Sequence, residues 1–180
     1  MIMWKRNEIV FKGLHFISWL IFIGLSIEAG ALIVNFIFSI FNPAVVKNLY
    51  QKLDLSAMYE TNKWIFFSVF SFILFIAMLK AYMFYVVINL LSKFNVEKPF
   101  SSFVSEQITK ISYFTFSIGL LSYLARQTTK QLVHYGYEIG NLNQFWADSQ
   151  AYILMAAVIY AIATIFAKGV ELQKENDLTI

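Results

Sequence analysis

Residues 64–91 read WIFFSVFSFILFIAMLKAYMFYVVINLL, and this stretch decides the fold. Lys80 is the charged residue within it. About 20 consecutive apolar residues cross the ~30 Å hydrocarbon core of a bilayer as a helix. No alternation of apolar and polar residues indicates a barrel strand instead. The stretch therefore predicts a transmembrane helix over residues 64–92.

Three further apolar stretches predict transmembrane helices over residues 14–42, 107–126 and 149–168. The chain has 180 residues, 59% hydrophobic and 14% charged. Soluble domains have roughly 45–50% apolar and about 25% charged residues. Because backbone polar groups in lipid must be satisfied within their own segment, these spans are helices. We expect an all-α membrane protein, an antiparallel bundle of four transmembrane helices. Residues 1–180 form a single membrane domain, with a cytoplasmic tail over 169–180.

The distribution of basic residues predicts the orientation. More lysines and arginines lie on the N-terminal segment, the second connection and the tail than on the other two connections. Cytoplasmic loops carry such an excess. The first apolar run is too long for a cleavable signal peptide, so it reads as an uncleaved span. We expect a multi-pass protein of the cell (inner or plasma) membrane with both termini in the cytoplasm.

Two of the connections carry structural signals. Asn42 and Pro43 are typical of a helix start, and the apolar residues after them recur at helical spacing, at Val46, Leu49, Leu53 and Ala57. This pattern predicts a short amphipathic helix on the outer interface. In the second connection, Pro99 ends the preceding helix and a serine caps the next. Residues 98–102 therefore form a cytoplasmic hinge.

Glu28 and Lys80 are charges inside the first two spans. A charge at that depth costs at least ~2.5–3.5 kcal/mol on insertion scales, so it usually has a partner or a task. Antiparallel packing places both at a comparable depth, and Asn35 follows Glu28 on the same helix face. We predict an intramembrane polar pair that holds the two helices in register. Two alternatives remain open: Lys80 snorkels while Glu28 stays protonated, or these residues line a transport path.

Small residues on the last two helices predict close packing. The third span carries them at helical spacing, at Ser112, Thr115, Gly119 and Ser122, and the fourth at Ala157, Ala161 and Thr164, with Ala156 and Ala163 beside them. Small side chains let helix backbones approach one another in membranes. We expect these seams to lie within the bundle, with a homodimer seam as the alternative.

Signals for catalysis or cofactor binding are absent from the sequence. There is no cysteine, and the two histidines, His15 and His134, lack a second histidine at metal-ligand spacing. No nucleophile–base pair, phosphate-binding glycine loop or paired-carboxylate motif is present. The basic residues are dispersed rather than clustered. We expect no enzyme activity, no metal or other cofactor, and no direct nucleic-acid binding.

The C-terminal tail carries a resemblance to a known family. It contains Gly169, then Glu171-Leu172-Gln173, Glu175-Asn176 and Asp177-Leu178-Thr179, and the hinge reads Lys98-Pro99-Phe100-Ser101. In these residues and in its four-span layout, the chain resembles a bacterial family of small four-helix membrane proteins known only as a domain of unknown function. The resemblance implies a bacterial inner-membrane protein. It also implies a gene that commonly lies beside one for a small helix-turn-helix regulator.

Three functions are compatible with these features. We expect an accessory, sensor-like or regulatory membrane subunit acting through a cytosolic partner, for which the regulator is the candidate. Its partner-binding residues are expected on the hinge and tail, at Lys98, Phe100, Glu171, Leu172, Gln173 and Leu178. The alternative is a small oligomeric transporter or channel with Glu28, Asn35 and Lys80 in a polar path. The third is binding of a lipid or small amphiphile between the outer amphipathic helix and the bundle.

Overall fold

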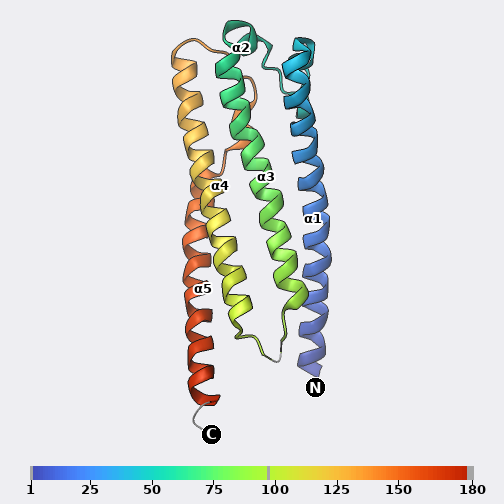
Figure 1. The fold of residues 1–180 in the computed structure, drawn as a ribbon, viewed down its shortest axis with the longest axis vertical. Helices are drawn as coiled ribbons and strands as arrows, with labels where there is room; N and C mark the ends of the chain where they lie inside the picture. Colours follow the sequence, from blue (N-terminus) through green and yellow to red (C-terminus); the bar gives the residue numbers. More distant parts are fainter. Residues whose placement is uncertain (1, 97, 178–180) are drawn as a thin grey trace.

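The computed structural model describes residues 2–96 and 98–177, and describes the side chains of residues 9–96 and 98–176. Four long helices dominate it: α1 (Ile2–Phe41), α3 (Lys63–Lys93), α4 (Ser102–His134) and α5 (Ser149–Asp177). Each contains a stretch long and apolar enough to cross a membrane. The protein is an all-α, multi-pass membrane protein, as the sequence predicts. Both termini lie at one end of the bundle, here called the terminal end (Figure 1).

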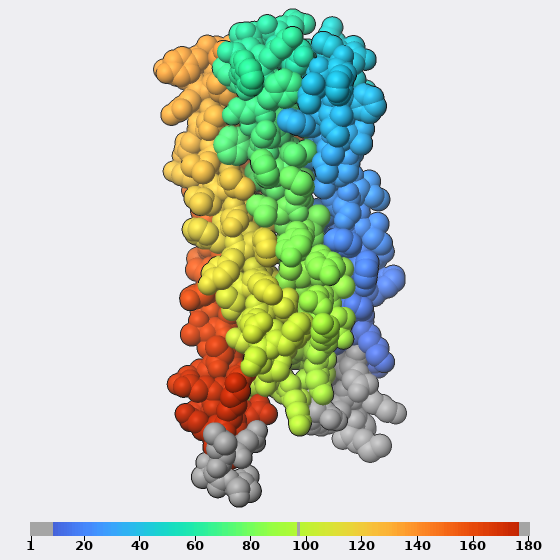
Figure 2. Space-filling model, viewed as in Figure 1, coloured from blue at the N-terminus to red at the C-terminus, as the bar shows by residue number. Residues whose placement is uncertain are grey.

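The helices pack in the order in which they follow one another in the chain. α3 packs against α1 and α4, and α4 packs against α5. The helices lie side by side across the face shown in Figure 2, with α5 partly behind α4. Within the most apolar 18-residue stretch of each helix, 11% of the residues are buried in α1 and in α5, and 39% are buried in α3 and in α4. α1 and α5 are therefore the edges of the array and expose most of their surface to lipid.

Side-chain caps set two of the helix starts. The Asn62 side chain accepts hydrogen bonds from the backbone N–H groups of Trp64 (2.9 Å) and Ile65 (3.4 Å) at the start of α3. The Ser101 hydroxyl accepts one from Val104 (3.2 Å) at the start of α4. Such caps satisfy N–H groups that have no partner within the helix. α4 starts earlier and ends later than the predicted 107–126, because the cap lies before the apolar stretch and a polar stretch continues the helix after it.

The connection between α1 and α3 differs from the single amphipathic helix that the sequence predicts. It forms 3₁₀ turns over Pro43–Lys47 and Tyr50–Lys52, and then the short helix α2 (Ser56–Thr61). The predicted cap is confirmed, since the Asn42 side chain accepts a hydrogen bond from Ala44 N–H at 3.1 Å. The prediction of one continuous helix is wrong, because Gln51 and Lys52 adopt left-handed backbone angles, with φ of 58° and 57°.

The amphipathic character of that connection is retained. Val46, Leu49 and Leu53 are buried as predicted, whereas Ala57 is exposed. The two left-handed residues change the register, so Leu55 and Met58 take the inward positions instead. The connection therefore covers the end of the bundle opposite the termini, here called the opposite end.

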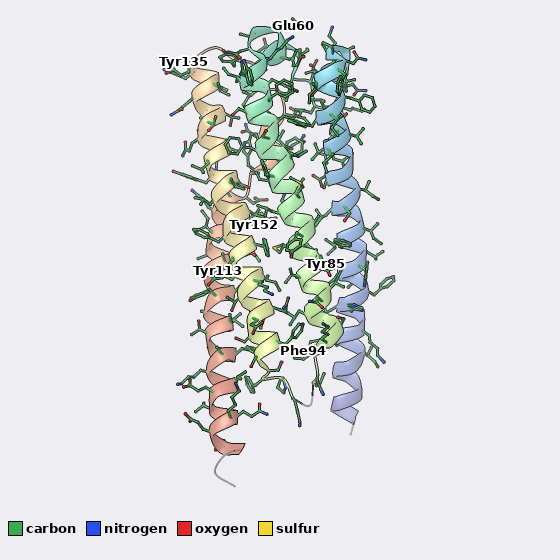
Figure 3. The ribbon with its side chains drawn as sticks, viewed as in Figure 1. Glu60, Tyr85, Phe94, Tyr113, Tyr135 and Tyr152 are labelled. Carbon is green, nitrogen blue, oxygen red and sulfur yellow. The ribbon has the colours of Figure 1, made fainter. Side chains whose placement is uncertain are left out.

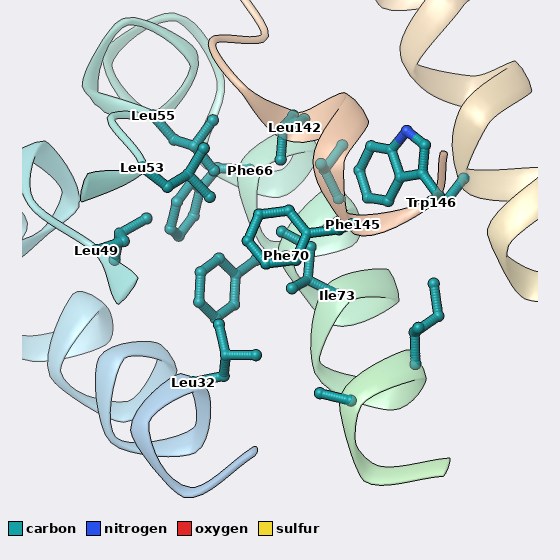
Figure 4. Close-up of a cluster of buried hydrophobic side chains, with 14 of the residues drawn as sticks. Leu32, Leu49, Leu53, Leu55, Phe66, Phe70, Ile73, Leu142, Phe145 and Trp146 are labelled. Atoms are coloured by element: carbon teal, nitrogen blue, oxygen red, sulfur yellow. The ribbon is translucent and has the colours of Figure 1, made fainter. Parts of the chain in front are cut away.

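The connection between α4 and α5, residues 135–148, returns along the bundle before α5 starts. Its turn η3 (Leu142–Phe145) and the following Trp146 bring three buried side chains into the main hydrophobic cluster. There they join Leu32 of α1 and Phe66 and Phe70 of α3 (Figure 4). Large buried side chains each stabilise the fold by about 1.5–3 kcal/mol. The core is consequently concentrated toward the opposite end, and α5 begins well below the upper end of α4 (Figure 1).

The contact between α4 and α5 is a seam of small residues. Ser112 and Gly119 are buried against α5, as the sequence predicts. Thr115 and Ser122 are also buried within the bundle, and the Thr115 hydroxyl lies 3.3 Å from the Met83 sulfur of α3. On α5 the buried positions are Ala156 and Ala163, whereas the predicted Ala157, Ala161 and Thr164 are exposed. The reason is register: the facing positions on α5 recur every seven residues, which aligns Ser149, Ala156 and Ala163 and turns their neighbours away.

Candidate functional site

Lys80 lies in the middle of α3 and is half-buried. Its Nζ atom stands 5.9 Å from the centroid of the Tyr152 ring of α5. Figure 3 places Tyr152 near mid-height in the bundle. A cation within about 6 Å of an aromatic face is attracted by the ring quadrupole, the more so where water is excluded. An aromatic ring is therefore the contact found for this intramembrane cation.

Glu28 lies on α1 and is also half-buried. Although the structure describes both side chains, it contains no ion pair between Glu28 and Lys80. Glu28 and Lys80 do lie at similar depths along the bundle axis. Ring contacts of Phe22 with Tyr85 (6.3 Å) and of Phe36 with Phe70 (5.6 Å) fix the antiparallel register of α1 and α3. This register places Glu28 within about three residues of the level of Lys80, or ~4.5 Å along the axis.

Asn35 completes the predicted polar set on α1. It is half-buried and lies seven residues beyond Glu28, on the same face of the helix. Lys80 turns toward α5 rather than α1, so the structure brings Lys80 and Tyr152 together and leaves Glu28 and Asn35 on the neighbouring helix. A functional role for these three residues stays a prediction.

At the terminal end, the hinge packs directly on α5. The Phe100 ring lies 5.4 Å from the Phe166 ring, centroid to centroid. A Cβ atom on Gly169 would lie 2.5 Å from Cδ1 of Phe100. Only a residue without a side chain allows the ring to sit this close. Two parts of the chain that the sequence proposes for partner binding, the hinge and the start of the tail, are thus in contact.

Beyond this contact α5 continues as a helix to Asp177. Lys168 Nζ and Glu171 Oε2 form an ion pair of 2.6 Å on its surface. Leu172 is 52% exposed and Lys98 is exposed, while Gln173 is half-buried. Leu178 lies outside the described residues. We refer to Lys98, Phe100, Lys168, Glu171, Leu172 and Gln173 together as the terminal-end surface.

At the opposite end, the α1–α3 and α4–α5 connections are linked through Asp54 and Gly140. One Asp54 carboxylate oxygen accepts hydrogen bonds from the Ser56 backbone N–H (2.9 Å) and hydroxyl (2.7 Å). These bonds, the backbone one first, lower the pKa of Asp54 below its ordinary value. Gly140 has φ of 50°, and a Cβ atom there would lie 3.1 Å from the Asp54 carbonyl oxygen. Glycine thus permits both the turn and the close approach of the two connections.

The described residues contain no group of three or more His, Asp or Glu side chains able to hold a metal ion. Sequence reasoning missed one other grouping. Arg126 and Trp146 line one cavity at the opposite end.

Comparison with known proteins decides the family. The family described as "Protein of unknown function (DUF2975)" matches residues 48–180. The chain belongs to this family. This confirms the resemblance that the tail and the hinge indicate. No curated protein and no solved structure matches the chain.

The segment shared with the DUF2975 family divides the candidate residues into two groups. It includes Lys80, Tyr152 and the whole terminal-end surface, as well as Arg126 and Trp146. All of α1 lies outside it, including Glu28 and Asn35. The family match therefore covers Lys80 and its aromatic contact, whereas the predicted acidic partner belongs to the part of the chain that the family description does not cover.

Proposed function

We propose that this protein is a non-enzymatic accessory or regulatory subunit of a bacterial inner membrane that binds a cytosolic protein through the terminal-end surface. The observation that carries the proposal is the packing of Phe100 against Gly169. This contact fixes the hinge to α5 at the point where α5 leaves the bundle. The helix that follows is thereby presented at a set position beside Lys98, which supports a binding role for this surface.

The construction of the surface supports a protein partner. It combines an exposed apolar side chain, Leu172, with the Lys168–Glu171 ion pair on one helical segment. A helix with a small apolar patch flanked by charges suits docking into a groove of another protein. The excess of basic residues at this end supports a cytoplasmic location for it. A small cytosolic regulator is the candidate partner, which the family resemblance suggests.

Site-specific photo-cross-linking tests the proposal. A photoreactive residue at position 172 should give a protein adduct in native membranes. The same residue at position 154 is the matched control, because Leu154 is also on α5 and is 69% exposed but lies two residues from Tyr152, near mid-height in the bundle (Figure 3). The combined variant Glu171→Lys with Leu172→Asp should reduce partner recovery about tenfold, the loss expected for ~1.4 kcal/mol. An adduct equal at both positions, or none at 172, contradicts the proposal.

A transporter or channel is the second candidate, and one observation favours it. Glu28 lies within a transmembrane helix and has no hydrogen bond or ion pair among the described residues. An intramembrane acid without a partner is often part of an ion or proton path. Ion flux into liposomes should then be abolished by Glu28→Gln in protein that keeps its thermal stability. Unchanged flux in that variant, or no flux in the wild type, excludes this function.

A further inference from the structure

The seam between α4 and α5 has a regular spacing along α4. The Ser105 hydroxyl donates to the Ala163 carbonyl (3.4 Å) and the Ser112 hydroxyl to the Ala156 carbonyl (2.9 Å). Gly119 continues the series, since a Cβ atom there would lie 3.1 Å from the Ser149 carbonyl oxygen. Each α4 position follows the previous one by seven residues, the repeat of packed helices.

Arg126 occupies the next position of this series. Ser149 is the first residue of α5, so no helical turn of α5 remains opposite Arg126. A cavity of about 400 Å³ opens there, and Trp146 and Ala147 contribute to its lining. Where the partner helix ends, α4 therefore changes from a small seam residue to a long cationic one that reaches over the start of α5.

Trp146, which contributes to the lining of the same cavity, holds a buried donor without a partner among the described residues. Trp146 is 2% exposed, and its Nε1 atom has no hydrogen-bond partner among the described residues. In Figure 4 the nitrogen lies on the side of the ring turned away from Leu142 and Phe145. Buried indole N–H groups usually find an acceptor, because leaving this hydrogen bond unmade costs about 1–3 kcal/mol. The indole N–H is therefore an unpaired, buried donor next to the cavity rather than part of its open surface.

The charges around the cavity define the kind of ligand that suits it. Lys130 lies one helical turn beyond Arg126 on α4, and both line the cavity, whereas no acidic residue does. The nearest acids along the chain, Glu138 and Asp148, each adjoin a lining residue, but both are exposed and neither is part of the lining. The N-terminus of α5 adds a partial positive charge at this point. Two cations suit an anion with several oxygens, the geometry that arginine binds through paired hydrogen bonds.

We propose that this cavity binds a phosphate group through Arg126 and Lys130, next to the Trp146 indole. Its depth agrees with a lipid headgroup as the source. From Ser102 to Arg126, α4 rises about 36 Å at ~1.5 Å per residue. The hydrocarbon core is ~30 Å thick, and the bilayer with headgroups is ~40–45 Å. With the hinge at one interface, Arg126 lies in the headgroup layer of the other. A free phosphate ion offers the same chemistry, and the experiment separates the two sources.

Tryptophan fluorescence of the purified full-length protein tests the site. Trp4, Trp19 and Trp64 are first replaced by phenylalanine so that Trp146 is the reporter. The probes are inorganic phosphate, phosphatidylglycerol in mixed micelles and, for a lipid without net charge, phosphatidylcholine. Phosphatidylglycerol should give a saturable change. Arg126→Gln combined with Lys130→Gln should weaken this binding about tenfold or more, as expected for loss of two charge-assisted contacts.

Matched variants keep the result interpretable. Lys47→Gln combined with Lys52→Gln removes the same charge from exposed residues at the same end and should leave binding within about twofold. Arg126→Lys keeps the charge and should retain part of the affinity, which separates loss of binding from loss of fold. Competition by inorganic phosphate assigns the site to the anion itself, and its absence assigns the site to the lipid. Equal binding by the cavity and control variants, or no saturable response to any probe, overturns the proposal.

Discussion

Gly119 lies so close to Ile153 that a Cβ atom on it would meet the Ile153 backbone nitrogen at 2.9 Å. Real side chains essentially never pack at that distance, so any larger residue must push α4 and α5 apart. The contact lies in the middle of the small-residue seam. It explains why this helix pair can approach closely in a medium where lipid competes for apolar surface.

Gly119→Ala should therefore destabilise the protein by about 1–3 kcal/mol, the usual cost of overpacking. Gly24→Ala is the matched control, because a Cβ atom on Gly24 meets nothing within 4 Å. Alanine favours a helix over glycine by up to ~1 kcal/mol, so the control should be neutral or slightly stabilising. Thermal unfolding in detergent, followed by circular dichroism, measures both. Equal stability of the two variants means that α4 and α5 are not this close.

The hinge contact makes a second prediction. Gly169→Ala should displace the Phe100 ring and increase hydrogen exchange of the backbone in the first turn of α4. The nearest atoms to the added Cβ atom all belong to the Phe100 ring. Gly169→Ala should therefore cost almost no further stability in a protein that already carries Phe100→Ala. A double-mutant cycle detects this as a coupling of about 0.5–3 kcal/mol. Additive effects show that the hinge does not rest on α5 through this pair.

The contact of Lys80 with Tyr152 makes a third prediction, which differs from the ion pair indicated by the sequence. Tyr152→Leu should cost roughly 0.5–2 kcal/mol of cation–ring attraction in addition to lost packing, while Tyr152→Phe should keep most of it. Because Glu28 does not pair with Lys80 here, exchanging the two charges should not restore stability lost in Glu28→Lys. Thermal unfolding of the single and exchanged variants decides. A clear rescue by the exchange means that the ion pair forms in the membrane.

Asp54 gives a pH dependence with a definite sign. Its pKa is lowered in the folded state by hydrogen bonds from the Ser56 N–H and hydroxyl. The stabilisation is fully present above the unfolded pKa of about 3.9 and is lost as the pH falls through the lower folded value. Asp54→Asn should be less stable than wild type at pH 6, and the difference should fade below about pH 4. The carboxylate is largely in water, so the effect is small. A difference that grows in acid contradicts this role for Asp54.

The sequence predicts the features that depend on residues close together in the chain, and it does not predict those that depend on packing between distant segments. The four spans follow from long apolar runs, and the Asn42 and Ser101 caps follow from local residue types. The break at Gln51 and Lys52 does not, because burial of Leu55 and Met58 in the bundle outweighs the local helical spacing. The same holds for α5, where packing against Ser112 and Ser105 selects Ala156 and Ala163 from a helix rich in alanine.

The candidate sites likewise divide into one that the sequence indicates and one that depends on the folded structure. The contact of hinge and tail combines two segments that the sequence already singles out. The cavity at Arg126 depends on where α5 begins relative to α4, which is a property of the folded connection. The seven-residue series Ser105, Ser112, Gly119 and Arg126 is visible in the sequence and is the one signal that could have indicated it.

The connection over residues 135–148 makes the last prediction. Leu142 has no exposed surface, and it lies in the cluster that also contains Phe66 and Phe70. Leu142→Ala should cost about 2–5 kcal/mol, because it removes buried atoms and leaves a cavity. Leu154→Ala, at a position 69% exposed on α5, should cost little. If the connection is anchored through Leu142, hydrogen exchange should rise throughout residues 137–148 in the first variant and stay unchanged in the second. Exchange that rises equally across all four long helices means instead that Leu142 supports the whole bundle rather than its connection.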